Sequence, residues 1–255
     1  IMGILNVTPD SFSDGGKFNQ IDAALKHVEE MIGDGADVID IGGESTRPWG
    51  YTKISDEEET GRVVPVIEAV KKEFGIPISV DTYKSGVAEA AAQAGADLIN
   101  DIWGLKYDPH MSEVIAKSGL ACCLMHNRDN TEYRNFMEDM KQDLRETIAL
   151  AKAAGIADDK IILDPGVGFA KSYENNLEVI RRLKEFNELK YPVLLGTSRK
   201  SVIGLTLDLP AAERVEGTIV TTVMAVEAGC MFVRVHDVKE NHRAIQMAEA
   251  ILDRK

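Results

Sequence analysis

The chain has 255 residues, of which 44% are hydrophobic and 28% are charged, a composition typical of globular proteins. Its 42 acidic and 29 basic residues give a formal net charge of -13, which argues against nucleic acid and anionic membrane surfaces as partners. An anionic substrate would therefore need a local cluster of cations. The sequence also contains no apolar run that approaches the roughly 20 residues of a membrane span. The three cysteines, Cys122, Cys123 and Cys230, lack a metal-binding spacing, and we expect them to be small buried hydrophobes in a cytoplasmic protein.

Short apolar runs rich in β-branched residues recur along the chain, and each ends in polar residues or glycine. They predict strands at Met2–Val7, Asp37–Gly43, Ile78–Asp81, Leu98–Ile102, Ala121–His126, Ile161–Asp164, Val193–Gly196 and Phe232–Val235. The segments between most of them carry helical signals. Eight strand–helix units in a chain of this length are typical of a (β/α)8 TIM barrel, and we expect residues 1–255 to form one such domain.

Three of the intervening segments have recognisable helix signals. Ser55 and Glu58 form a predicted capping box at a helix start. The alanine-rich run before Gly95 predicts a helix that ends at that glycine. A third helix is expected to bury one apolar face made of Leu144, Ile148, Leu150 and Ala151.

A doubly wound open sheet is the alternative architecture, but its usual nucleotide-binding loops are incomplete. The segment Gly166–Gly168 lacks the third glycine of a dinucleotide-binding loop. The segment Gly196–Ser201 lacks the glycine that precedes the lysine of a phosphate-binding P-loop. We therefore favour the barrel.

Polar residues stand at the C-terminal end of every predicted strand, where a TIM barrel forms its active site. They are Asn6, Asp40, Glu44, Asp81, Asn100, Asp101, His126, Asp164, Ser198, Arg199, Lys200, Arg234 and His236. Any single one of them could be polar only because strand ends meet water. The complete ring, which mixes acids, amides and cations, predicts a binding site.

The acidic and amide members of this ring suit a flat heterocycle. Asp81, Asn100 and Asp164 offer groups that could pair with an amidine-like edge, at about 1.5–3 kcal/mol for each charge-assisted hydrogen bond.

The basic members supply the cationic cluster that an anion would need. These residues are Arg47, Lys200, Arg234 and His236, and an arginine plane can also stack on a ring. One alternative is that these cations only form salt bridges to the aspartates of the site. Another is a zinc hydrolase with His126, Asp164 and His236 as ligands, although no H-x-H or HExxH spacing supports it.

Two segments resemble the signature segments of the dihydropteroate synthase family. They are Asn6–Gly16, with the sequence Asn-Val-Thr-Pro-Asp-Ser-Phe-Ser-Asp-Gly-Gly, and Ile39–Pro48. Further matches follow in the family's order at Ser79–Thr82, Ile99–Asp101, Asp164–Phe169, Ser198–Lys200 and Arg234–Asp237. The resemblance covers essentially the whole chain, and the two segments together are highly specific.

The resemblance implies a homodimeric TIM barrel of folate biosynthesis. Such an enzyme joins 6-hydroxymethyl-7,8-dihydropterin diphosphate to p-aminobenzoate, with Mg2+, and releases 7,8-dihydropteroate and diphosphate. The family is also the sulfonamide target.

The same resemblance implies roles for individual residues. Those expected to bind the pterin are Asp81, Asn100, Asp164, Lys200 and Arg234. Those expected to bind the diphosphate are Asn6, Thr46, Arg234 and His236, with Asn6 also ligating Mg2+. Those expected around p-aminobenzoate are Phe12, Thr46, Arg47, Pro48, Phe169 and Ser201. The residues expected to be catalytic are Asp14, Arg47, Asp164 and Lys200.

We hypothesise an SN1-like substitution, in which the aryl amine attacks only after diphosphate has left and two glycine-flanked loops have closed to exclude water. Trp49 departs from the family pattern, because a glycine usually follows the Arg-Pro pair, and it could lie outside the aminobenzoate pocket or reshape it. Two rival functions remain open. One is a pterin-binding methyltransferase domain that works with a corrinoid partner, and the other is a non-catalytic pterin-binding homologue.

Overall fold

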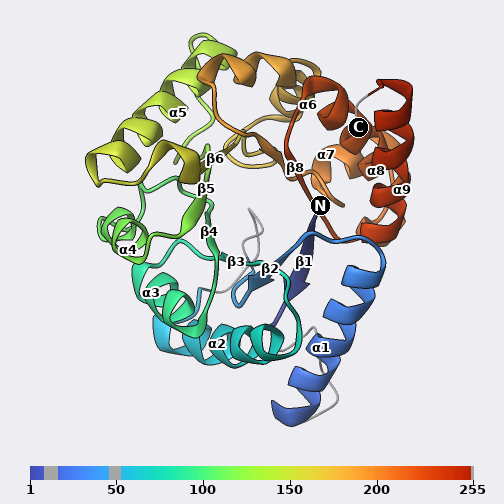
Figure 1. The fold of residues 1–255 in the computed structure, drawn as a ribbon. Coiled ribbons are helices and arrows are strands. Elements are labelled where there is room, and N and C mark those ends of the chain that lie inside the picture. The colour runs from blue at the N-terminus through green and yellow to red at the C-terminus, as the bar shows by residue number, and fades with distance from the viewer. Residues whose placement is uncertain (9–16, 46–52, 254–255) are drawn as a thin grey trace.

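Eight parallel strands form the barrel of the computed structural model, which describes residues 1–8, 17–45 and 53–253 (Figure 1). The strands are β1 (Met2–Asn6), β2 (Val38–Gly42), β3 (Ile78–Asp81), β4 (Leu98–Asp101), β5 (Ala121–Met125), β6 (Ile161–Asp164), β7 (Leu194–Leu195) and β8 (Phe232–Val235). Their hydrogen-bonded order is β6-β5-β4-β3-β2-β1-β8-β7. The predicted (β/α)8 architecture is confirmed, with each strand within two residues of its expected position.

The barrel closes where β6 meets the start of β7. Leu163 forms a parallel bridge with Val193, and its backbone N–H donates to the carbonyl of Pro192 at 2.9 Å. This contact joins the two ends of the sheet, so the C-terminal ends of all eight strands open onto one shared face.

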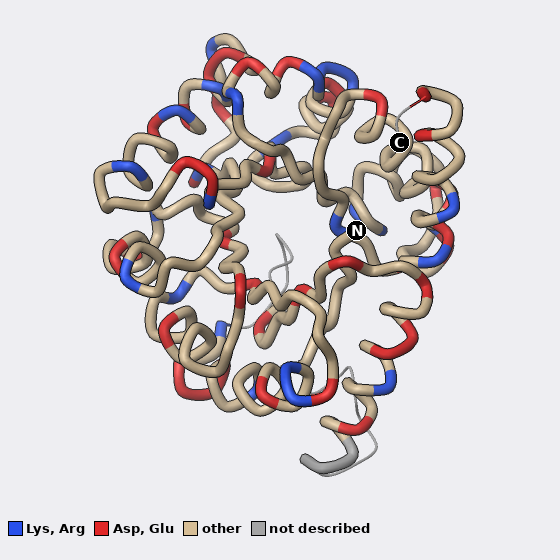
Figure 2. Tube along the Cα trace, viewed as in Figure 1, with Lys and Arg blue, Asp and Glu red and all other residues tan. Residues whose placement is uncertain are grey.

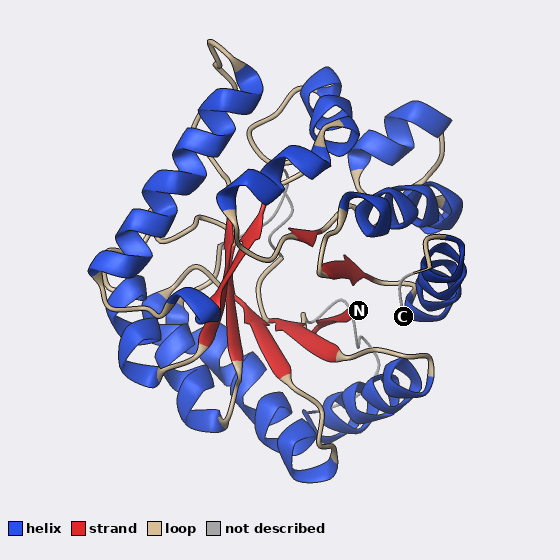
Figure 3. Cartoon of the chain, turned by 45° about the horizontal axis from the view of Figure 1, so that its top comes forward, coloured by secondary structure: helices blue, strands red, loops and turns tan. Residues whose placement is uncertain are grey.

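Helices surround the strands as an outer ring (Figure 3). They are α1 (Lys17–Gly33), α2 (Asp56–Glu73), α3 (Ser85–Ala94), α4 (Met111–Ser118), α5 (Phe136–Ala153), α6 (Tyr173–Arg181), α7 (Ser201–Leu207), α8 (Val215–Ala228) and α9 (Val238–Ile251), with short 3-10 turns η2 (Asp158–Lys160), η3 (Leu183–Leu189) and η4 (Ala211–Glu213). None of the described helices is long and apolar enough to cross a membrane. Acidic and basic residues both lie on the outer helices, while several acidic positions lie on strands (Figure 2).

The helix signals are confirmed in part. Ser55 caps α2, because its hydroxyl accepts from the N–H of Glu58 at 3.2 Å, but the Glu58 carboxylate pairs with Arg62 instead of returning to the cap. Gly95 ends α3 in the left-handed conformation, with φ of 104°. The expected apolar face of α5 is wrong at Leu150, which is 45% exposed, because Thr147 occupies the buried position on that face.

The inside of the barrel changes from apolar to polar along its axis. At the N-terminal end of the strands, an apolar cluster fills the interior with Met2, Leu98, Cys123, Ile162 and Leu194. Side chains two residues apart on a strand point to the same face. Consequently Asn100 lies above Leu98, and Asp164 lies above Ile162. The barrel floor is therefore closed by apolar packing, and its mouth is lined by polar groups.

Candidate active site

Arg234 on β8 lies at the centre of a buried polar network at the mouth of the barrel. Its Nε donates to Asp40 Oδ2 at 2.5 Å, and its Nη2 donates to Asp81 Oδ2 at 2.8 Å. Asp40 also accepts from Ser79 Oγ at 2.5 Å and from Asn100 Nδ2 at 3.3 Å. Burial alone would lower the pKa of Arg234, but the carboxylates of Asp40 and Asp81 raise it above its ordinary value.

The strand register explains why these groups meet. Asp81 on β3 is aligned with Gly42 on β2 and with Asn100 on β4, so acid and amide groups stand side by side. Both side chains are buried, at 3% and 4% exposure, and they form one wall of the site. The predicted proximity of Asp81 and Asn100 is therefore present in the structure.

A second group of site residues converges around Gly196, at the end of β7. A Cβ built on this glycine would lie 3.7 Å from Asp164 Oδ2, 3.8 Å from Lys200 Nζ and 3.9 Å from Arg234 Cβ. The glycine therefore leaves open the space in which a carboxylate, an ammonium and a guanidinium-bearing side chain approach one another. The sequence predicts that acidic and basic side chains lie together at the strand ends, and the structure contains such a group here.

The turn after β6 contacts both Asp164 and Lys200. The N–H of Gly166 donates to Asp164 Oδ1 at 2.7 Å, and Lys200 Nζ donates to the carbonyl of Val167 at 2.6 Å. The Phe169 ring lies against the same ammonium, with 4.9 Å between Nζ and the ring centroid. Gly166 has φ of +69°, and a Cβ there would lie 2.1 Å from the carbonyl oxygen of His126, so this turn requires glycine.

Burial shifts the pKa values of Asp164 and Lys200 in opposite directions. It raises the pKa of Asp164, although Lys200 and the Gly166 N–H counteract it. It lowers the pKa of Lys200 to about 8, although Asp164 counteracts it. The pair is thus an ammonium next to a desolvated carboxylate, which can bind both a donor edge and an acceptor atom of a flat ring.

Asn6 and His236 lie at the ends of two neighbouring strands. Asn6 ends β1 with an exposed side chain, and its Oδ1 would lie 3.7 Å from a Cβ on Gly42, which also approaches Asp81. His236 follows β8, and its Nδ1 lies 2.9 Å from Ser198 Oγ. Ser201 is exposed as the first residue of α7.

Several predicted site residues fall outside the described residues, and these are Phe12, Asp14, Thr46, Arg47, Pro48 and Trp49. Within the described part of the chain, no three His, Cys, Asp or Glu side chains gather as a metal site. His126, considered as a zinc ligand, lies 2.9 Å from Asp143 through Nε2 and 3.0 Å from Lys171 through Nδ1.

Sequence reasoning gave Asp40 no specific partner, although the structure makes it the main acceptor for Arg234. The available signal was a carboxylate inside the apolar run Val38–Ile41, because a charge in a buried strand requires a partner. It also missed Lys84, whose buried ammonium bridges Glu44 at 2.8 Å and Glu59 at 2.7 Å.

Comparison with known proteins identifies the family of the chain. The profile of a family described as pterin binding enzyme matches residues 2–236. The dihydropteroate synthase of Clostridium beijerinckii is 63% identical over 100% of the chain and 94% of the relative. A crystal structure of dihydropteroate synthase from Clostridium difficile with pteroic acid has a TM-score of 0.96 and 53% identity, over 100% of this chain and 96% of that one. The Yersinia pestis enzyme in a sulfonamide drug complex has a TM-score of 0.92 and 45% identity, over 99% and 94% of the two chains.

The chain belongs to the pterin binding enzyme family, and its fold is that of a TIM barrel. Within that class its function is that of a dihydropteroate synthase, a transferase of folate biosynthesis that forms 7,8-dihydropteroate.

Proposed function

We propose that the buried acid–amide–cation wall binds the pterin of 6-hydroxymethyl-7,8-dihydropterin diphosphate. Asp81, Asn100 and Asp164 receive the N–H groups of the pterin edge, and Lys200 donates to a ring acceptor. The observation that carries this assignment is the convergence of Asp164, Lys200 and Arg234 around Gly196. Arg234 is anchored by Asp40 and Asp81, which leaves its guanidinium plane at the mouth of the barrel as a surface for stacking.

The diphosphate is assigned to Asn6, Arg234 and His236 at neighbouring strand ends, together with Thr46. Asn6 is also the proposed Mg2+ ligand. An exposed amide oxygen fits Mg2+, which prefers oxygen ligands and is commonly held by few protein ligands plus substrate phosphates. When bound, Mg2+ would neutralise charge that develops on the leaving diphosphate.

The p-aminobenzoate side is assigned to Phe12, Thr46, Arg47, Pro48, Phe169 and Ser201, and Asp14 is assigned a catalytic role beside Arg47. Phe169 and Ser201 flank Lys200, which supports placing the second substrate beside the pterin. We infer an SN1-like order, in which the electron-rich ring and the Asp164 carboxylate stabilise a cationic pterin carbon. Diphosphate release at a comparable rate without p-aminobenzoate would support this order.

The decisive variant for the pterin assignment is Asp164→Asn. It removes the charge that pairs with the pterin edge while conserving size, and we expect pterin affinity to fall at least tenfold, as measured by calorimetry with 6-hydroxymethylpterin. Asp158→Asn on the outer η2 turn is the matched control, and its affinity should equal that of the parent. Full pterin affinity in Asp164→Asn would refute the assignment.

Sulfonamides are expected to compete for the p-aminobenzoate side, since the Yersinia pestis relative binds such a drug. The effect of Trp49 on this competition can be measured directly. Equal inhibition constants for the parent and a Trp49 deletion would place the ring outside the pocket.

A homodimer is proposed from an apolar surface on one side of the barrel. Here α8 packs against both α7 and α9 (Figure 1). Each of these helices carries exposed apolar side chains. They are Leu205, Leu207, Val220, Val223, Met247 and Ile251, with exposed fractions from 37% to 70%. Exposed apolar side chains that gather on neighbouring helices commonly mark an interface.

A cytoplasmic location is also proposed. Cys122 and Cys123 are adjacent, buried and present as free thiols, and burial raises the pKa of Cys122 to about 12. Such thiols fit a reducing compartment.

A further inference from the structure

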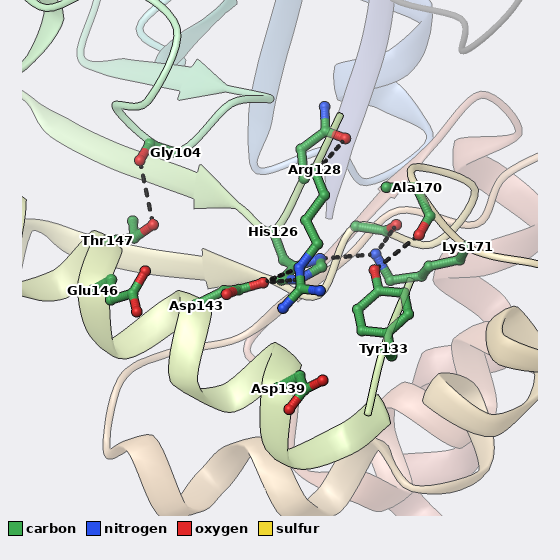
Figure 4. A network of polar contacts seen from close by, with 12 residues as sticks. Gly104, His126, Arg128, Tyr133, Asp139, Asp143, Glu146, Thr147, Ala170 and Lys171 are labelled. Atoms are coloured by element: carbon green, nitrogen blue, oxygen red, sulfur yellow. Dashed lines mark hydrogen bonds and ion pairs between the residues drawn. The ribbon is translucent and has the colours of Figure 1, made fainter. Parts of the chain in front are cut away.

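A chain of polar contacts runs from α5 to the turn that follows β6 (Figure 4). His126 Nε2 lies 2.9 Å from Asp143 Oδ2, and His126 Nδ1 lies 3.0 Å from Lys171 Nζ. Arg128 donates to the same Asp143 oxygen at 2.5 Å. None of these four residues was assigned to substrate, so their arrangement needs its own explanation.

Lys171 uses all its hydrogen-bonding capacity inside the protein. Beyond His126, its Nζ donates to the carbonyls of Gly166 and Phe169, each at 2.9 Å. An ammonium group has three N–H donors, and these three acceptors match that number. The next residue is also held, because the Tyr133 hydroxyl donates to the carbonyl of Ala170 at 2.8 Å. The segment 166–170 is therefore held by Lys171 of the same loop and by Tyr133 from the loop between β5 and α5.

The protonation states are consistent with this chain of donors. Burial lowers the pKa of His126 to about 4, and the Lys171 charge acts in the same sense, so the imidazole is neutral at pH 7. A neutral imidazole that donates from Nε2 to Asp143 presents a lone pair on Nδ1 to Lys171. Burial opposes ionisation of Asp143, but His126 and Arg128 lower its pKa below the ordinary value. Burial lowers the pKa of Lys171 to about 7; Asp164 and Asp143 oppose this shift, and Lys200 and Arg128 add to it, so all three donors are present below that pH.

The turn held by Lys171 also contacts the proposed pterin site. Gly166 uses its carbonyl for Lys171 and its N–H for Asp164 Oδ1, so the two contacts lie on one residue. Val167, the next residue, accepts from Lys200 Nζ. A displacement of this turn would thus move the partners of both Asp164 and Lys200.

We propose that Lys171, oriented by His126 and Asp143, is a positioning residue that fixes the Gly166–Phe169 turn and through it the Asp164 carboxylate and the Lys200 ammonium. This inference rests on the pterin site proposed above. It concerns residues outside that site, and Lys171 acts only through the turn.

The principal test is Lys171→Met, which keeps the length of the side chain but removes the three donors. At about pH 6, where the amine is protonated in the parent, we expect the dissociation constant for 6-hydroxymethylpterin to rise at least tenfold. Amide hydrogen exchange should accelerate in a peptide that covers residues 165–172, where the N–H groups of Gly166, Gly168 and Phe169 are hydrogen-bonded. His126→Gln, which retains Lys171 but disrupts its orientation, should change both quantities in the same direction by a smaller factor.

Lys141→Met is the matched control, because Lys141 is also buried but lies on α5, where it pairs with Glu138 at 2.8 Å and Glu188 at 2.9 Å. This control should lose thermal stability with unchanged pterin affinity and unchanged exchange in residues 165–172. Pterin affinity within twofold of the parent in Lys171→Met would overturn the inference. If Asp164→Asn still lost affinity, the pterin site itself would stand, whereas unchanged affinity in both variants would refute the site.

Discussion

Lys200 is held by two contacts and has a lowered pKa. It lies beside the Phe169 ring and donates to a backbone carbonyl, and burial lowers its pKa to about 8. The proximity of Asp164 opposes this shift but does not cancel it. Lys200 is therefore cationic at neutral pH, yet it can lose its proton within the range in which the protein can be assayed.

The affinity for pterin should accordingly fall as the pH rises through about 8. Below that pH the ammonium can donate to the ring acceptor, and above it the neutral amine is a weaker donor. Titration calorimetry with 6-hydroxymethylpterin between about pH 6.5 and 9.5 measures the change. Lys200→Arg should bind more weakly at neutral pH but show a flatter profile, because guanidinium remains charged. A flat profile in the parent would contradict the assigned donor.

Individual residues also show what could not be predicted from the sequence. Asp81, Asn100, Asp164 and Lys200 were predicted to share a site because each stands at a strand end, and they do lie at the barrel mouth. Their exact partners were not predictable. Arg234 pairs with Asp40 and Asp81 because β8 and β2 both flank β1 and β3 follows β2 in the sheet, and sequence spacing does not encode that neighbourhood.

At the scale of secondary-structure elements, the periodic signals predicted most of what the structure contains. All eight strands were placed because buried parallel strands are short, apolar and followed by polar residues. Leu150 was misplaced because helical periodicity alone does not decide which side chain of α5 meets the core. The contact of Lys171 with the β6–α6 turn was not predicted, since a loop conformation depends on tertiary partners.

Ser55→Ala tests the predicted start of α2. The hydroxyl satisfies one N–H of the first helical turn, so its removal should lower the free energy of unfolding by about 1 kcal/mol. Denaturant unfolding measures this difference. Ser118→Ala at the end of α4, where the hydroxyl only donates to the carbonyl of Ile115, should cost less. Equal costs for the two variants would argue against a specific capping contribution.

At the scale of the whole molecule, the charge distribution and the apolar side surface have different consequences. The net charge of -13 would repel an anionic substrate. The mouth of the barrel, however, gathers Lys200 and Arg234, although Arg234 is also paired with Asp40 and Asp81, as the salt-bridge alternative expected. The exposed apolar side chains of α7, α8 and α9 lie on the flank of the barrel.

Val220→Asp tests whether that flank is the dimer surface. Val220 is 60% exposed on α8, and a charge there should be tolerated by the monomer but excluded from an apolar interface. Analytical ultracentrifugation should show the parent as a dimer and the variant with about half that mass. Leu150→Asp, on the exposed side of α5, should leave the mass unchanged. A dimeric Val220→Asp variant would place the interface elsewhere.

The most direct test of the central claim is a coupled assay on the purified protein with 6-hydroxymethyl-7,8-dihydropterin diphosphate and p-aminobenzoate, with and without Mg2+. We predict one 7,8-dihydropteroate for each diphosphate released, dependence on Mg2+, and loss of product in Asp164→Asn at subsaturating pterin. Absence of dihydropteroate from the parent protein with both substrates and Mg2+ would contradict the account.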